Sequence, residues 1–245
     1  MTWLLRSACC CSRGRIRARN EDNFFFDGEN LPEENGGLEK TLVLTGPLWK
    51  DRVLAVFDGM GGERFGHTAA YTATDAMKSL KSEDPEQIIQ QLNLRVFHKA
   101  QSLFTSRMGC TAAMLFFRKG RLTVCNLGDS RIFRLRDGVL EQLSQDHTDE
   151  ALLRQRGISS KPRLTQHLGI DPEELYLVPY VAEQALRFGD RYLICSDGLT
   201  DMVPTEQIGA LLQKGSAATA AQALTQAALD GGGRDNITVI VCCVY

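Results

Sequence analysis

The segment VLAVFDGMGGERFG, residues 53–66, runs from an apolar stretch through one acidic residue into a glycine-rich turn. Residues 53–57 are mainly strand-forming side chains, and Asp58 follows them directly. A carboxylate at the mouth of a buried strand costs stability unless another group pairs with it. Three glycines in the next four positions keep the backbone there open to close approach. The segment therefore predicts a buried strand that ends where Asp58 meets a partner.

Other acidic residues stand at the ends of apolar strands in the same way. Asp197 follows YLICS, Asp235 precedes NITVIV, and the pair Glu21 and Asp22 precedes NFFF. Strand ends can converge on one edge of a sheet, where crowded carboxylates repel one another and lose hydration. Mg²⁺ or Mn²⁺ would resolve this conflict, because both prefer oxygen ligands and keep several waters. An Asp-Gly pair can also be a simple turn, as at residues 137–138, so the acidic residues indicate a metal site only when taken together.

Turn signals and helical periodicity indicate antiparallel sheets covered by helices rather than alternating βαβ units. Lys119-Gly120, Gly128-Asp129 and Asp137-Gly138 are predicted hairpin turns. The polar stretch 27–50 is predicted as a surface loop or hairpin. The predicted strands include residues 4–11, 23–26, 52–57 and 236–245, and the predicted helices are residues 66–80, 205–213, 217–229 and one that Asp84 caps before Pro85.

The composition is that of an ordinary globular protein. With 43% hydrophobic and 24% charged residues, the 245-residue chain can bury a sizeable core. A formal net charge of −2 gives no support for a nucleic-acid surface or an anionic-membrane surface. No apolar run approaches the roughly 18 residues that a membrane span needs. Because no repeat or linker interrupts the chain, we expect one domain over residues 1–245.

The N-terminus and the cysteines favour a reducing, cytoplasmic setting. The start MTWLLRSACCC lacks the basic region and long apolar stretch of a secretory signal. The eight cysteines include three consecutive and two adjacent ones, and none has the spacing of a zinc site. They are predicted to be small apolar residues of strands.

Five segments, in their order along the chain, resemble the metal-dependent protein phosphatases of the type 2C kind in their bacterial form. These segments are RARNED, VFDGMGGERFG, LGDSRIFRLRDG, CSDGLTDMV and GGRDNITVIV, and the resemblance runs from about Gly14 to Val241. Each motif alone is weak, but five in the right order are specific. The resemblance implies an α+β fold, a four-layer α-β-β-α sandwich of two mainly antiparallel sheets flanked by helix pairs, with metals at one edge between the sheets.

The resemblance also implies a metal site built on Asp58. This residue matches the aspartate that bridges two Mn²⁺ or Mg²⁺ ions, and Gly59 matches the residue whose carbonyl serves one of them. Asp197 and Asp235 match ligands of the other ion. A two-metal site lowers the pKa of a bridging water, so that hydroxide exists near neutral pH, and it clamps an in-line displacement at phosphorus.

Further site residues follow from the same resemblance. Glu21 and Asp22 match an acidic pair that holds one metal partly through its waters, and Asp129 matches a residue linked to a third, weaker ion. Arg17 matches the arginine that grips the substrate phosphate, a task that suits a planar, bidentate guanidinium. Asn236 flanks the metal edge and is expected to orient a ligand or a water.

The implied function is hydrolysis of phosphoserine and phosphothreonine in proteins by a metal-activated water, without a phosphoenzyme. Arg17 and Asp58 are the expected catalytic residues. The expected partners are phosphorylated proteins and a bacterial serine/threonine kinase pathway whose signal the protein reverses. We expect a monomer with neither nucleic-acid binding nor membrane insertion.

Two alternative functions compete with this one. A nucleotide-binding protein could use DGMGG as a phosphate loop, but Gly61-Gly62 lacks the lysine and hydroxyl of a P-loop. A catalytically weak pseudophosphatase could act as a regulatory binding module on the same fold. The enzyme is favoured because the chain retains the main residues of the site, Asp58, Asp197, Asp235 and Arg17.

The sequence departs from the family pattern at three places. Met60 stands where many eukaryotic members carry a histidine proposed as general acid, so the proton donor to the leaving group is not identified. The segment that forms a mobile flap in relatives is short here, with residues 151–163 between QDHTDE and LTQHLG, and this should leave the site more open. The stretch 27–50 is longer than usual and is a candidate for touching substrates.

Overall fold

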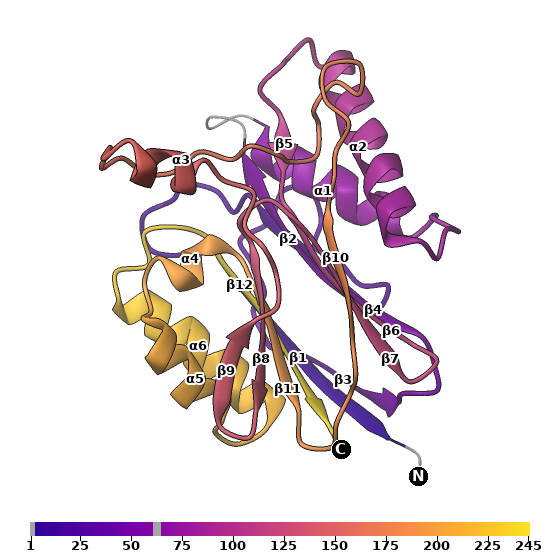
Figure 1. Cartoon of the computed structure of the whole chain (residues 1–245), viewed down its shortest axis with the longest axis vertical. Coiled ribbons are helices and arrows are strands. Elements are labelled where there is room, and N and C mark those ends of the chain that lie inside the picture. Colours follow the sequence, from indigo (N-terminus) through magenta and orange to yellow (C-terminus); the bar gives the residue numbers. More distant parts are fainter. Residues whose placement is uncertain (1–2, 61–64) are drawn as a thin grey trace.

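Two antiparallel sheets lie face to face in the computed structural model, which describes residues 3–60 and 65–245 (Figure 1). The predicted turn glycines 61 and 62 lie outside the described residues. The first sheet has the strand order β3-β1-β12-β11-β8-β9. The second has the order β10-β7-β6-β4-β2, and the short β5 pairs with the end of β4. The strands are β1 (Leu4–Ser12), β2 (Asp22–Phe26), β3 (Leu42–Pro47), β4 (Arg52–Met60), β5 (Gly109–Cys110), β6 (Ala112–Arg118), β7 (Arg121–Leu127), β8 (Arg131–Arg136), β9 (Val139–Gln142), β10 (Tyr180–Gln184), β11 (Arg191–Cys195) and β12 (Ile237–Val244).

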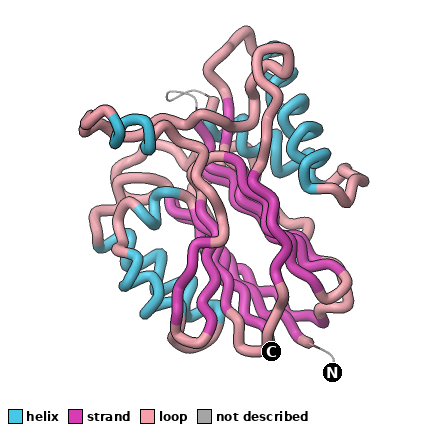
Figure 2. The backbone as a smooth tube through the Cα atoms, viewed as in Figure 1, coloured by secondary structure: helices cyan, strands magenta, loops and turns pink. Residues whose placement is uncertain are grey.

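Helices cover the outer face of each sheet, so the predicted four-layer sandwich is confirmed (Figures 1 and 2). Two helices, α1 and α2, pack on the second sheet, and α4, α5 and α6 pack on the first. Asp84 caps α2 as predicted, because its side chain accepts a hydrogen bond from the amide of Glu86. The helices are α1 (Gly66–Met77), α2 (Pro85–Ser102), α3 (Glu150–Gln155), α4 (Asp197–Thr200), α5 (Thr205–Leu212) and α6 (Ala217–Asp230).

The main core lies between the two sheets. Strands there alternate side chains between an inner face and a helix-covered outer face, and both faces are apolar. Phe117 of β6 and Tyr192 of β11 meet across this core, with ring centroids 6.1 Å apart and planes at 78°. This edge-on contact joins the two sheets at their inner faces.

Two of the three predicted hairpin turns are confirmed. Lys119-Gly120 joins β6 to β7 and Asp137-Gly138 joins β8 to β9, with positive φ at both residues of each turn. The prediction for Gly128-Asp129 is wrong, because β7 and β8 belong to different sheets. The chain crosses there from one sheet to the other. Gly128 makes this crossing possible, with φ of 101° and no room for a Cβ beside Thr111.

The stretch 27–50 is more ordered than a surface loop. It contains β3, which pairs with β1 at the edge of the first sheet, so the hairpin prediction missed a strand whose partner is distant in sequence. β3 lies at the end of the molecule where both chain termini lie (Figure 1). None of residues 27–50 lines the cavity described below.

All eight cysteines are buried, unpaired and placed in strands, as predicted for small apolar residues. Burial is the largest cause that raises the pKa of each thiol above its ordinary value. Over the part of the chain that the structure describes, no helix has the length and apolar character that crossing a bilayer requires.

Phe117→Ala should destabilise the protein by about 3–5 kcal/mol, because it removes a ring from the core between the sheets and leaves a cavity. Urea unfolding followed by tryptophan fluorescence measures this loss. Phe104→Ala is the matched control, since Phe104 is 98% exposed and its change should stay within about 0.5 kcal/mol. Equal effects of the two substitutions would contradict this account of the core.

Candidate active site

Strands β2 and β4 bring two carboxylates to opposed positions. The strands pair antiparallel with Asp22 directly opposite Asp58. Beyond this pair, the amide of Gly59 donates to the carbonyl of Glu21 at 3.2 Å and extends the ladder. The strand register therefore places four predicted site residues together at one edge of the sheet.

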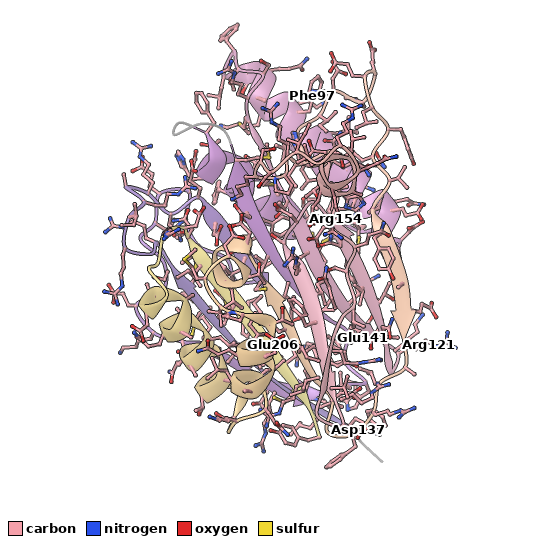
Figure 3. The ribbon with its side chains drawn as sticks, turned by 60° about the vertical axis from the view of Figure 1, so that its left-hand side comes forward. Phe97, Arg121, Asp137, Glu141, Arg154 and Glu206 are labelled. Carbon is pink, nitrogen blue, oxygen red and sulfur yellow. The ribbon has the colours of Figure 1, made fainter. Side chains whose placement is uncertain are left out.

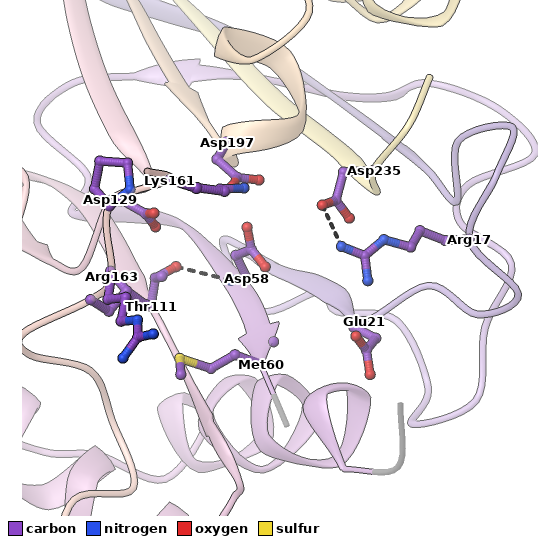
Figure 4. A pocket seen from close by; sticks show the side chains of 13 residues that line it. Arg17, Glu21, Asp58, Met60, Thr111, Asp129, Lys161, Arg163, Asp197 and Asp235 are labelled. Atoms are coloured by element: carbon purple, nitrogen blue, oxygen red, sulfur yellow. Dashed lines mark hydrogen bonds and ion pairs between the residues drawn. The ribbon is translucent and has the colours of Figure 1, made fainter. Parts of the chain in front are cut away.

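A cavity of about 580 Å³ opens at this edge (Figure 4). Its walls come from the end of β4, the β7–β8 crossing, the start of α4, the turn before β12 and the segment between β9 and β10. Seven of the eight residues predicted to hold metal or phosphate line it, namely Arg17, Glu21, Asp58, Gly59, Asp129, Asp197 and Asp235. The eighth, Asp22, does not line the cavity.

Asp22 is buried behind the cavity wall, with 1% of its surface exposed. Its Oδ2 accepts hydrogen bonds from the hydroxyls of Ser196 and Thr238, each at 2.7 Å. Its Oδ1 has no hydrogen-bond partner among the described residues. Burial raises the pKa of Asp22 to about 7, although the two hydroxyls act in the opposite direction.

Asp58 lies at the centre of the acidic group (Figure 4). Its backbone is fixed by Thr111, whose Oγ1 accepts from the Asp58 amide at 3.1 Å and whose amide donates to the Asp58 carbonyl at 2.9 Å. The hydroxyls of Thr111 and Ser130 are 2.7 Å apart and hydrogen-bonded. Burial, followed by the charges of Asp22 and Asp197, raises the pKa of Asp58 well above its usual range.

The glycine at position 59 is required by packing. A Cβ at Gly59 would lie 2.2 Å from the carbonyl oxygen of Gly66 and 2.5 Å from that of Glu21. A side chain there would push α1 away from the strand end. Gly59 therefore lets the helix close against the site, and the residue itself lines the cavity beside Asp58.

Arg17 and Asp235 form an ion pair on one side of the cavity (Figure 4). The Nη2 of Arg17 donates to Oδ2 of Asp235 at 2.6 Å, and 47% of the arginine side chain stays exposed. Burial lowers the pKa of Arg17, but the hydrogen bond and charge of Asp235 outweigh this and raise it. The guanidinium is thus held, fully charged, at the solvent side of the site.

Asn236 fixes the loop that carries Arg17. Its Nδ2 donates to the carbonyls of Arg13 and Arg19 at 2.8 and 2.9 Å, and its Oδ1 accepts from the amide of Glu21 at 2.8 Å. With these bonds the side chain, 3% exposed, is occupied by backbone groups. Asn236 therefore holds the loop that carries Arg17, and through the amide of Glu21 it also fixes the backbone of an expected metal ligand.

On the opposite side of the cavity, Lys161 approaches Asp197 (Figure 4). Its Nζ lies 3.4 Å from Asp197 Oδ2 and 3.3 Å from Asp201 Oδ2. The charge of Asp197 is the largest cause that raises the pKa of Lys161. Burial raises the pKa of Asp197 and raises that of nearby Asp129 to about 6.

The residues fit a divalent cation. Burial is the first cause that raises the pKa of four aspartates of this edge, and the charges of neighbouring carboxylates raise it further; these are Asp22, Asp58, Asp129 and Asp197. Among the residues that the structure describes, Glu21 Oε1 and Asp22 Oδ1 are buried without a hydrogen-bond partner. Within residues 3–60 and 65–245, no three acidic, histidine or cysteine side chains enclose a single ion by themselves. Water would therefore complete the coordination, as is usual for Mg²⁺ and Mn²⁺.

Several residues of the site escaped sequence reasoning. Thr111, Ser196 and Thr238 support Asp58 and Asp22 from the second layer of the site. The available signal was a hydroxyl residue inside or beside an otherwise apolar strand. Lys161 carried no comparable signal, since one lysine in a polar segment is ordinary.

Comparison with known proteins decides the family. A sequence model described as Protein phosphatase 2C matches residues 47–230. The chain belongs to this family. It is 32% identical over 264 residues to the serine/threonine protein phosphatase PstP of Mycobacterium tuberculosis, covering 98% of the chain and 45% of PstP. It is 33% identical to the serine/threonine phosphatase stp of Listeria welshimeri, covering 94% of the chain and 92% of the relative.

Solved structures of this phosphatase fold agree with the family. The catalytic domain of PstP, determined in complex with two manganese ions, superposes with a TM-score of 0.77 and 31% identity over 100% of both chains. The chain therefore spans about half the length of full PstP, and the half that it matches is the catalytic domain of PstP.

In metal-free protein, Asp22→Asn should remove a pH-dependent loss of stability. Because the pKa of Asp22 in the folded protein is raised to about 7, folded Asp22 keeps a proton that the unfolded chain loses above about pH 4. The free energy of unfolding of wild-type protein therefore falls as the pH rises from about 4 to about 7. The stability of the variant relative to wild type should rise between about pH 4.5 and 7.5, on the order of a few kcal/mol.

Urea unfolding in EDTA at several pH values in that window tests this expectation. Exposed Glu39 supplies the control, and Glu39→Gln should follow the wild-type pH dependence. A constant difference between Asp22→Asn and wild type at every pH would show that Asp22 does not titrate in this way.

Proposed function

We propose that this chain is a metal-dependent hydrolase of phosphoserine and phosphothreonine in proteins. The observation that carries the proposal is the position of Arg17 beside the carboxylates of Asp58 and Asp235 in one open cavity. Acidic residues that can bind cations lie next to the half-exposed guanidinium of Arg17. This arrangement matches a phosphate monoester, whose oxygens need positive charge from both sides. The serine/threonine phosphatase names of its relatives support the same substrate class.

The chain's own residues offer ligands for two divalent ions. Asp58 would bridge them, with the Gly59 carbonyl on one ion and Asp197 and Asp235 on the other, and with Glu21 and Asp22 as the acidic pair of the first. When bound, the ions supply a water that is activated near neutral pH and they hold the phosphoryl oxygens. Mn²⁺ is the first ion to test, because the PstP catalytic domain was determined with two manganese ions. A third, weaker ion is proposed near Asp129.

The protein side of the reaction rests on Arg17. To bind substrate, its guanidinium would exchange Oδ2 of Asp235 for two phosphate oxygens and orient the phosphorus for in-line attack. The oxygen of water then bonds to phosphorus as the ester P–O bond breaks. One proton of the water ends on the serine or threonine hydroxyl. Asn236 keeps the Arg17 loop in place during this exchange.

The physiological setting is proposed from the family and from the open site. The mainly exposed segment 150–161 contributes Lys161 to the cavity lining, so it stands where a phosphorylated segment of a folded protein would approach. We propose a cytoplasmic role in signal transduction, with the chain acting as a monomer that reverses a bacterial serine/threonine kinase.

Asp58→Asn should abolish at least about 99% of phosphate release from a phosphothreonine peptide with Mn²⁺, because the bridging charge is lost. EDTA should stop the wild-type reaction, and added Mn²⁺ should restore it. Activity that survives EDTA or the substitution would rule out the two-metal site. A folded wild-type protein that binds Mn²⁺ but hydrolyses no phosphopeptide would instead indicate a pseudophosphatase.

Arg17→Ala should lower kcat/KM for the phosphopeptide by about ten- to a hundredfold, since it removes charged hydrogen bonds to phosphate. Arg15→Ala is the matched control, because Arg15 lies two positions away, pairs with Asp230 at 3.4 Å and does not line the cavity. Similar losses in both variants would point to general loss of positive charge rather than to phosphate binding by Arg17.

A further inference from the structure

A short flap stands over one side of the cavity. We define it as residues 150–162, between β9 and β10. Its base is closed by a bridge between Thr148 and Leu164 and by two hydrogen bonds between Asp149 and Arg163, at 2.7 and 3.0 Å. The helix inside it, α3, has no buried residue. Apolar burial therefore does little to hold the flap in one position.

Lys161 links this flap to the site. Its ammonium reaches α4 and forms ion pairs with Asp197 and Asp201, at 3.4 and 3.3 Å. Over the described part of the chain, these are the ion pairs that join the flap to the rest of the protein, because the pair of Arg154 with Glu150 lies within the flap. Figure 4 shows the Lys161 side chain extending between Asp129 and Asp197.

A divalent ion and the ammonium of Lys161 would need the same carboxylate. Asp197 is among the acids placed to hold an ion, and it accepts Lys161 through Oδ2. Two cations a few ångströms apart repel each other, so occupation of Asp197 by one weakens its hold on the other. Asp201 is outside the proposed ligand set and pairs with the same ammonium.

We propose that Lys161 is a built-in cation that competes with a divalent ion for Asp197, so that metal binding releases the flap from the site. The inference rests on the proposed function, because it requires metal at these carboxylates. Coupling between two binding events is reciprocal. The factor by which bound metal weakens the docking of the flap is therefore also the factor by which Lys161 weakens metal binding. The flap of metal-free protein is held closed by Lys161, and that of the loaded protein is freer to admit a phosphoprotein.

Lys161→Met should tighten Mn²⁺ binding by about two- to fivefold, the range expected for loss of a competing exposed ion pair. Calorimetric titration of metal-free protein with Mn²⁺ measures this without substrate. The side chain of Lys161 is 70% exposed, so the variant should fold normally. Arg156→Met removes the same charge from the flap at a residue that does not line the cavity, and its Mn²⁺ affinity should match wild type.

Limited proteolysis measures the reciprocal effect, which is the release of the flap when metal binds. Trypsin cleaves after arginine, and Arg154 and Arg156 are both exposed in the flap. In EDTA, wild-type protein should be cut there more slowly than Lys161→Met. Mn²⁺ should raise the wild-type rate to that of the variant and leave the variant's rate unchanged.

The outcomes separate this inference from the proposed function. Wild-type protein that binds no Mn²⁺ would overturn both. Wild-type protein that binds Mn²⁺ and hydrolyses phosphopeptide, with Lys161→Met unchanged in Mn²⁺ affinity and in tryptic cleavage, would overturn the inference alone. A variant with raised KM and unaltered Mn²⁺ affinity would assign Lys161 to substrate binding, and this too would overturn it.

Discussion

Repulsion among carboxylates at one edge of a two-sheet sandwich is the constraint on which the rest of the structure depends. Asp22 and Asp58 face each other across adjacent strands, and Asp197 and Asp129 approach from the other sheet and from the crossing between the sheets. A stable core alone would not gather these charges, because burial disfavours each of them. The apolar sandwich supplies the stability, and a divalent cation would supply the missing compensation.

The surrounding residues limit the movement of these acids more than they neutralise them. Thr111 holds the backbone of Asp58, and Ser196 and Thr238 hold one oxygen of Asp22. Asn236 holds the Arg17 loop through three backbone groups. A site fixed in this way needs little reorganisation when charge develops on phosphate. Such preorganisation is the usual source of electrostatic catalysis.

The sequence was most informative where local chemistry decides structure. A capping aspartate before proline and two Asp-Gly or Lys-Gly turns matched the structure, whereas the strand predicted to end before Asp58 continues through it to Met60. It was least informative where distant segments decide. Gly128-Asp129 has the composition of a hairpin turn, but the partner strands that take β7 and β8 into different sheets lie far away in the chain. β3 and Lys161 were missed for the same reason, since their partners, β1 and α4, are remote in sequence.

The eight thiols, buried in strands and shifted toward their protonated form, carry a consequence for redox chemistry. Peroxide attacks exposed thiolates, and phosphatases that use a cysteine nucleophile are silenced when that sulfur is oxidised. The cavity proposed as the active site is lined by carboxylates and an arginine, and none of its lining residues is a cysteine. At the proposed site, oxidation of one of these thiols would therefore not modify a group that contacts the phosphate.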